Sequence, residues 1–234
     1  MNQTDTAKRA AGEHAATLVD SGMAVGLGTG STTAFALEAL GRRIRDEGLQ
    51  IRGVPTSYAA EILGRKHGIP LATLNDVDGI DLALDGADEV DPALNLIKGR
   101  GAAHAREKVV ASEAARFVVL IDPSKRVEQL GTSMPVPIEI MPMAAASVLR
   151  MLRALDATAA IRMGQRKDGP VVTDQGLWVV DARFDGIADP QALSRTLHQQ
   201  PGILDHGLFL GLATDVIVGQ PGGATEHLRK QSGA

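Results

Sequence analysis

The segment MAVGLGTGSTTAFALEAL, residues 23–40, decides the fold of this chain. Its apolar start at residues 23–27 predicts a short strand, the glycines after it predict a tight turn, and residues 31–40 predict a helix. A glycine-rich connection from strand to helix exposes backbone N–H groups, and the helix dipole adds positive potential there. We therefore expect the turn Gly26-Leu27-Gly28-Thr29-Gly30-Ser31-Thr32 to bind a phosphate, although the same pattern also suits a plain turn with a helix cap.

Outward from this segment, strands and helices alternate through the first half of the chain. The pattern predicts strands at residues 51–54, 70–73, 80–84 and 117–121, and helices at residues 6–20, 58–67 and 102–113. Strands separated by helices indicate an α/β fold with a mostly parallel sheet that is covered on both faces. In such sheets ligands bind at the loops that leave the carboxyl ends of the strands.

The pattern changes after Gly131. It predicts a strand at residues 136–140, a helix at 144–155, strands at 159–163 and 177–182, a helix at 190–199 and a short strand at 202–205. This β-α-β-β-α-β order is typical of a smaller, ferredoxin-like α+β unit. We expect residues 208–212 and 214–218 to return to the large sheet.

A cluster of acids follows the apolar run at residues 80–84. The cluster reads Asp85-Gly86-Ala87-Asp88-Glu89. If the loop begins at Asp85, both aspartates can face one pocket from the strand end and exchange protons with sugar hydroxyls. The alternative is a turn ordered by solvated acids, which is a common use of Asp-Gly. We expect Glu89 and Asp91 to be solvated or to order the turn before Pro92.

A second glycine loop, Lys98-Gly99-Arg100-Gly101, leads into the helix at residues 102–113. Lys98 could stabilise a developing oxyanion or hold the substrate, while the glycines let backbone amides approach closely. Glu107 follows this loop by about one helical turn, so it is a candidate general base. Its alternative role is that of a surface acid paired with the basic residues beside it. Lys125 follows the strand at residues 117–121 and could hold a phosphate or a carboxylate.

The composition excludes several classes of function. The 234 residues carry a net charge of -4, which argues against general nucleic-acid binding, and the single Trp, single Tyr and four Phe leave little for base stacking. The chain lacks cysteine, so it cannot form a disulfide, a zinc–thiolate site or a thiol nucleophile. Its six histidines show no metal-binding spacing. No signal peptide is recognisable, and no apolar run approaches the roughly 20 residues of a membrane helix, so we expect a cytoplasmic protein with no membrane partner.

Several segments of the chain resemble the A family of ribose-5-phosphate isomerases. They are GLGTGSTTAFALEAL, DGADEVDPALNLIKGRGAAHAREKVVAS, FVVLIDPSKRVEQLG, PVPIEIMPMA, VVTDQG and PGILDHGLF, in that order. The resemblance implies a Rossmann-like domain at residues 1–130 plus 207–234, with an inserted ferredoxin-like domain at residues 131–206. It also implies a homodimer or homotetramer that needs no cofactor and no metal.

The resemblance further implies a reaction of the non-oxidative pentose phosphate pathway, the interconversion of D-ribose 5-phosphate and D-ribulose 5-phosphate through a cis-enediol. Asp85 or Asp88 would open the sugar ring, Glu107 would move the proton between C2 and C1, and Lys98 would stabilise the enediol oxygens. The implied substrate-binding residues are Thr29-Gly30-Ser31-Thr32, Asp85-Gly86-Ala87-Asp88, Lys98-Gly99-Arg100-Gly101 and Lys125. The chain departs from the family at Arg100, where glycine is usual, and its PTSYAAE segment at residues 55–61 is only loosely similar.

Three other functions remain open on the sequence. The same architecture could serve an amino-sugar phosphate deaminase, or a sensor that binds a sugar phosphate without turnover. A dinucleotide-dependent oxidoreductase fits less well, because Ser31 stands where the dinucleotide fingerprint has its third glycine.

Overall fold

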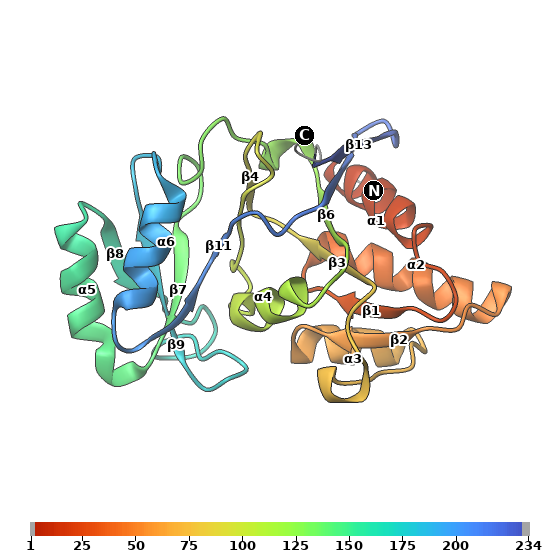
Figure 1. Cartoon of the computed structure of the whole chain (residues 1–234), viewed down its shortest axis with the longest axis horizontal. Coiled ribbons are helices and arrows are strands. Elements are labelled where there is room, and N and C mark those ends of the chain that lie inside the picture. Colours follow the sequence, from red (N-terminus) through yellow and green to blue (C-terminus); the bar gives the residue numbers. More distant parts are fainter. Residues whose placement is uncertain (1–2, 231–234) are drawn as a thin grey trace. The chain divides into compact units, whose positions relative to one another are not determined.

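A computed structural model describes residues 3–230 of the chain (Figure 1). It divides into two compact units. The first comprises the described parts of residues 1–87, 106–125 and 211–234, and the second comprises residues 88–105 and 126–210. None of the described helices is long and apolar enough to cross a membrane.

The first unit is built on a six-stranded sheet of order β13-β12-β6-β3-β1-β2. The strands are β1 (Ala24–Leu27), β2 (Arg52–Pro55), β3 (Leu82–Gly86), β6 (Phe117–Ile121), β12 (Asp215–Gly219) and β13 (Thr225–Arg229). All pairings are parallel except that of β12 with β13. Leu27 lies opposite both Pro55 and Leu84, so β1, β2 and β3 end side by side at the carboxyl end of the sheet.

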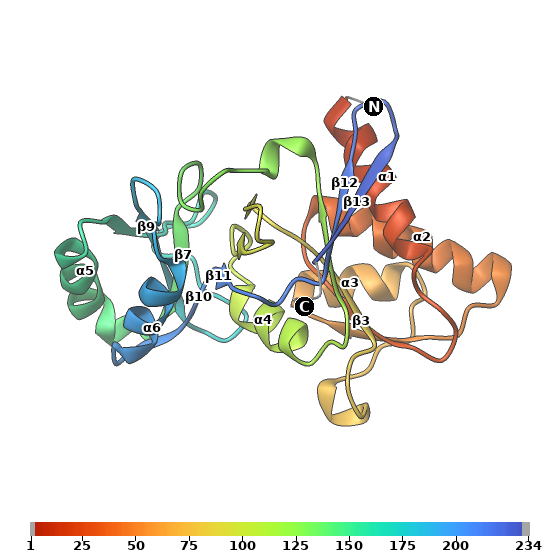
Figure 2. The same ribbon diagram turned by 45° about the horizontal axis from the view of Figure 1, so that its top comes forward.

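Helices cover both faces of this sheet. They are α1 (Gln3–Ala16), α2 (Ser31–Glu47), α3 (Tyr58–Lys66) and α4 (His104–Ser112) (Figures 1 and 2). Alternate strand residues such as Val25 and Leu27 form a core with α1 and α2. Gly26 points to the other face, where a Cβ on it would lie only 2.6 Å from Cγ1 of Val110 in α4. The close packing of α4 on the sheet therefore needs glycine at position 26.

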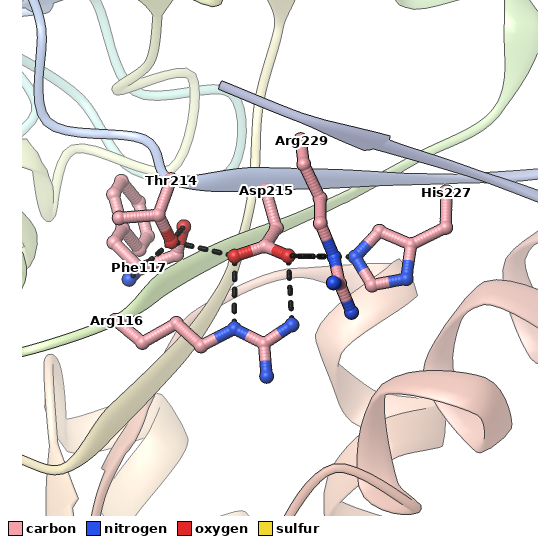
Figure 3. Close-up of polar contacts among 6 residues, drawn as sticks. All are labelled: Arg116, Phe117, Thr214, Asp215, His227 and Arg229. Carbon is pink, nitrogen blue, oxygen red and sulfur yellow. Dashed lines mark hydrogen bonds and ion pairs between the residues drawn. The ribbon is translucent and has the colours of Figure 1, made fainter. Parts of the chain in front are cut away.

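An ion-pair cluster joins the amino ends of β6 and β12, away from the end where the glycine turn leaves β1 (Figure 3). Arg116 donates from Nε and Nη2 to the two carboxylate oxygens of Asp215 at 2.9 and 2.7 Å. Thr214 Oγ1 donates to Asp215 at 2.7 Å, and His227 Nε2 of β13 lies 2.7 Å from the same carboxylate. Burial alone would raise the pKa of Asp215, but these hydrogen bonds outweigh it and hold the pKa well below its usual range.

The second unit contains an antiparallel four-stranded sheet of order β10-β7-β9-β8. Its elements, in chain order, are β7 (Val136–Ile140), α5 (Ala145–Ala154), β8 (Thr158–Ile161), β9 (Trp178–Arg183), α6 (Pro190–Gln199) and β10 (Ile203–His206). A three-stranded sheet of order β11-β5-β4 belongs to the same unit, formed by β4 (Glu89–Val90), β5 (Leu96–Ile97) and β11 (Leu208–Phe209). The expected α/β fold class, a mostly parallel sheet with a separate α+β unit, is confirmed.

Two strand predictions were wrong. Residues 70–73 form only an isolated bridge between Leu71 and Gly53, because Pro70 has no N–H for a ladder and Thr73 already caps the short helix η1 (Leu74–Asp76). Residues 208–212 do not return to the large sheet. Instead β11 pairs with β5, next to the close approach of Gly207 to Lys98.

Residues 88–105 pack within the second unit, whereas the expected boundaries placed them with the parallel sheet. The boundaries 1–130 plus 207–234 and 131–206 remain a prediction about domains. The sequence also gave no sign of β13, since residues 225–229 are mostly polar and form an edge strand that is buried only in part.

Candidate active site

The glycine turn of the first unit leaves the start of α2 open to a ligand. The N-cap residue is Gly30, with a φ of +125°, and no side chain caps the first N–H groups of the helix. The hydroxyl Oγ1 of Thr33 is buried and has no hydrogen-bond partner among the described residues. A Cβ on Gly86 would lie 3.9 Å from this hydroxyl, so Thr33 faces the segment that carries Asp85. The turn thus offers several unused donors to an anion.

Asp85 fixes the shape of the same turn. It lies inside β3 and is 3% exposed, so the expected loop does not begin there and a solvated role for it was wrong. Its Oδ1 accepts the N–H groups of Thr29 at 3.1 Å and of Gly86 at 2.7 Å. A Cβ on Gly28 would lie 2.4 Å from Asp85 Cγ, so only glycine allows the turn to approach this carboxylate so closely.

Two hydroxyl residues that the sequence did not single out as site residues join this turn. Thr29 Oγ1 lies 3.0 Å from Thr56 Oγ1 and 2.6 Å from Ser57 Oγ, and both partners are buried. Ser57 also caps α3 by accepting the N–H of Ala60 at 3.0 Å. The signal was present, because two hydroxyl residues directly follow a strand that is parallel to and next to the one that leads into the glycine turn.

Glu107 lies in the first turn of α4 and is 5% exposed. The alternative role as a surface acid was therefore wrong for this side chain. Val110, one turn later on the same helix face, packs against Gly26, on the face of the sheet to which Ala83 also points. Asp85 points to the same face of the sheet as Ala83, two residues nearer the carboxyl end. Since a crossover helix runs antiparallel to its strands, Glu107 lies toward that end too, on the same side as Asp85.

Lys125 lies in the short helix η2 (Pro123–Lys125), directly after the carboxyl end of β6. Its N–H donates to the carbonyl of Asp122 at 3.2 Å, and Asp122 in turn accepts a hydrogen bond from the N–H of Ser124 at 3.0 Å. The first unit therefore gathers Thr29-Gly30-Ser31-Thr32, Asp85-Gly86-Ala87, Glu107 and Lys125 at one end of its sheet, as the sequence suggested.

The remaining predicted site residues belong to the second unit. Asp88 is partly exposed, and its Oδ2 accepts the N–H of Arg100 at 3.0 Å. Lys98 is 3% exposed, with its ammonium 5.5 Å from the centre of the Phe209 ring. Gly99 has a φ of +108°, and a Cβ there would lie 2.8 Å from the ring of His104. Arg100, the departure from the family pattern, is an exposed residue.

The expectation of a solvated Glu89 was wrong. This side chain is completely buried and accepts the N–H groups of Gly131, Ser133 and Met134, each at 2.6 Å. Those donors are at least 42 residues away along the chain, so no local pattern could reveal them. Asp91 orders a turn, as expected, but the turn is the one that contains Pro92 and not one before it, since Asp91 accepts the N–H of Asn95 at 2.8 Å.

The second unit also contains a cluster that the histidine spacing did not suggest. Potential ligand atoms of His198, Asp205 and His206 lie within 4.8 Å of one another, the first residue on α6 and the others on β10. However, Leu208 donates its N–H to His206 Nδ1 at 3.2 Å, so the neutral ring carries its proton on Nε2, which faces His198 Nδ1 at 3.3 Å. A metal ligand normally has the opposite arrangement, with the second nitrogen donating. The hydrogen bonds favour a structural role for this cluster.

Comparisons with known proteins identify relatives of this chain. The family model described as ribose 5-phosphate isomerase A (phosphoriboisomerase A) matches residues 52–223. A ribose-5-phosphate isomerase A of Thermosynechococcus vestitus is 54% identical over 91% of this chain and 91% of that protein, and one of Haloarcula marismortui is 51% identical over 95% of each.

Solved structures are similar over almost the whole chain. A D-ribose-5-phosphate isomerase in complex with phospho-erythronic acid is 45% identical, with a TM-score of 0.94 over 98% of this chain and 100% of that one. Ribose 5-phosphate isomerase A of Methanocaldococcus jannaschii is 42% identical, with a TM-score of 0.91 over 95% of this chain and 98% of that one.

Proposed function

This chain belongs to the ribose 5-phosphate isomerase A family, and from that membership we propose how its residues interconvert D-ribose 5-phosphate and D-ribulose 5-phosphate. The isomerase activity itself follows from the family, which supports neither the deaminase nor the non-catalytic sensor. The observation that carries the residue assignment is a buried glutamate, Glu107, on the same face of the sheet as Asp85 and toward its carboxyl end. Because burying an acid costs free energy, acids are rarely buried on a helix face that packs against a sheet, and such a residue is a candidate for a function.

The phosphate of the substrate binds at the glycine turn in this proposal. Thr29-Gly30-Ser31-Thr32 supply backbone N–H groups at the start of α2, and Thr33 adds a buried hydroxyl. Lys125, which follows the carboxyl end of strand β6, adds a positive charge. Because these groups act on a part of the substrate that does not react, their removal raises KM more than it lowers kcat.

Glu107 is the general base that takes the proton from C2 of the open aldose and returns it to C1. The intermediate is a cis-enediol whose oxygens carry negative charge. Lys98 and the backbone N–H groups of Gly99-Arg100-Gly101 stabilise that charge in this proposal. Independence from metal remains a prediction, and full activity of the enzyme in excess chelator is the result that supports it.

Asp88 rather than Asp85 opens the sugar ring in this proposal. Oδ1 of Asp85 already accepts two N–H groups that shape the phosphate turn, whereas Asp88 is partly exposed and accepts the Arg100 N–H through its Oδ2. D88N should therefore lower kcat on the cyclic sugar. D85N should instead loosen the turn and raise KM, and the opposite pair of results would exchange the two roles.

The test of the reaction is a coupled isomerase assay on ribose 5-phosphate with chelator present. Wild-type turnover that vanishes in E107Q, with phospho-erythronic acid still bound, supports the assignment; near-normal turnover in E107Q refutes it. We also propose a homodimer or homotetramer in the cytoplasm. Light scattering after size-exclusion chromatography would test the assembly, and cell fractionation the location.

A further inference from the structure

Arg162 joins the antiparallel sheet of the second unit to the Lys98-Gly99-Arg100-Gly101 loop. It directly follows β8. Its guanidinium donates hydrogen bonds to the carboxylate of Asp181 in β9, from Nε at 2.8 Å and from Nη2. The remaining nitrogen, Nη1, donates to the carbonyl oxygens of both Gly99 and Arg100 at 3.0 Å. Ala160 lies opposite Asp181 in the β8–β9 pairing, so Arg162 and Asp181 are diagonal neighbours on one face of the sheet.

These bonds determine which way the loop peptides face. The chain contains no cis peptide among its described residues, so each carbonyl points away from the N–H of the next residue. Because the Gly99 carbonyl accepts a hydrogen bond from Arg162, the Arg100 N–H must point the other way, where it donates to Asp88. Because the Arg100 carbonyl also accepts a hydrogen bond from Arg162, the Gly101 N–H points away from Arg162 as well.

Besides Arg162, the loop is held by the Ala102 N–H, which donates to the Gly99 carbonyl at 3.0 Å, and by the Arg100 N–H, which donates to Asp88. Gly99 and Ala102 both have positive φ, +108° and +57°, and the second value is unfavourable for alanine. Gly101 and Arg100 are exposed, and glycine lets the adjoining peptides rotate at low cost. Such strained segments persist only where their surroundings fix them. The side chain of Arg162 is 16% exposed and that of Asp181 is 28% exposed. Because the pair is bidentate and mostly buried, it holds the guanidinium in one orientation.

We propose that Arg162, held by Asp181, is a positioning residue that aims the loop N–H groups at Asp88 and at the enediol oxygens. This inference rests on the proposed function, because it assumes that Asp88 and the loop act on the sugar. Arg162 itself does not touch the substrate in this proposal. Without it the Gly99 carbonyl keeps only its bond from the Ala102 N–H, so the two peptides at Arg100 flip more readily. A flip misdirects Asp88 and replaces a donor with a carbonyl oxygen that faces the developing charge.

The experiment compares R162Q with R116Q, because Arg116 also forms a bidentate pair with an aspartate but lies in the first unit, at the amino ends of the strands. We expect R162Q to lose about 10- to 100-fold in kcat with KM changed far less, since the misplaced groups act on the transition state. Its affinity for phospho-erythronic acid, whose carboxylate carries negative charge as the enediol does, should fall in parallel. R116Q should lose stability while keeping kcat within twofold.

Hydrogen exchange gives a readout that does not depend on catalysis. The Arg100 N–H should exchange about tenfold faster in R162Q than in the wild type, because its bond to Asp88 is released. The proposal would be overturned if the Arg100 N–H of R162Q exchanged at the wild-type rate, or if the kcat of R162Q stayed within twofold of wild type. If R162Q does not fold, R162K is judged by the same two criteria. A wild-type enzyme without isomerase activity would refute the proposed function alone, since the exchange result would still show whether Arg162 sets the loop.

Discussion

Replacing Asp215 by asparagine tests how much the ion-pair cluster of Figure 3 contributes to the stability of the first unit. Asp215 is 3% exposed and receives two N–H groups from Arg116, the hydroxyl of Thr214 and the ring of His227. Asparagine has nearly the same shape, but it carries no charge, and its NH₂ group must face one of these donors. At least one charge-assisted bond is then lost and one donor left unpaired.

A lost charge-assisted bond costs about 1.5–3 kcal/mol, and a broken buried pair about 3–5 kcal/mol. Because the side chain of Arg116 is 31% exposed, water can partly solvate it after the change. We therefore expect D215N to lower the free energy of unfolding at pH 7 by about 2–3 kcal/mol, which corresponds to about 5–10 °C in Tm for a chain of this length.

The effect should also depend on pH with a definite sign. The folded-state pKa of Asp215 lies below its value of about 3.9 in the unfolded chain, so its ionisation stabilises the fold above that value. The difference between wild type and D215N should be constant near neutral pH and shrink as the pH falls below about 4.

The assay is urea denaturation followed by circular dichroism at a series of pH values. The control is E61Q, which breaks a surface pair on α3 and should cost about 0.3–0.5 kcal/mol. A loss in D215N no larger than in E61Q, or a difference that does not shrink in acid, would refute the reasoning.

Three further predictions follow from the close contacts and buried acids. G28A places a Cβ 2.4 Å from Asp85 Cγ and should lower kcat/KM by about 100-fold, whereas G222A, where a Cβ meets nothing within 4 Å, should not. E89Q should cost about 3 kcal/mol in urea denaturation, because a Gln amide cannot accept all three N–H groups that Glu89 accepts. E139Q should gain stability relative to wild type as the pH rises from 4 to 8, since burial raises the pKa of Glu139 despite its bond from the Thr173 hydroxyl. If E89Q and E139Q lost the same free energy of unfolding at pH 8, the predictions for both variants would be contradicted.

The elements that the sequence predicted best are those whose local pattern and tertiary environment agree. The strands at residues 117–121 and 136–140 and the helix at 190–199 have the bounds expected of them. The first two are buried along their whole length, and the helix begins with Pro190 after the capping Asp189. The glycine turn was also found correctly, because glycine at positions 28 and 30 is required by contacts and by φ that few other residues tolerate.

The features that the sequence missed depend on contacts between distant segments. Residues 208–212 are apolar enough for either sheet, and only the approach of Gly207 to Lys98 selects the three-stranded one. The local sequence around Glu89 does not indicate that its side chain is buried, because its three N–H partners lie in a loop far along the chain. Arg162 is likewise unremarkable in sequence, since its carbonyl acceptors at Gly99 and Arg100 precede it by more than sixty residues.

Solvent exchange during turnover reports whether the Glu107 carboxylate carries the proton between C1 and C2. In D₂O the wild-type enzyme should place deuterium on the sugar carbon that receives the proton, which NMR detects. E107Q should lose both isomerisation and this exchange by about 10²–10⁴-fold while it still binds phospho-erythronic acid. Deuterium incorporation by E107Q within tenfold of the wild-type rate would show that another group moves the proton.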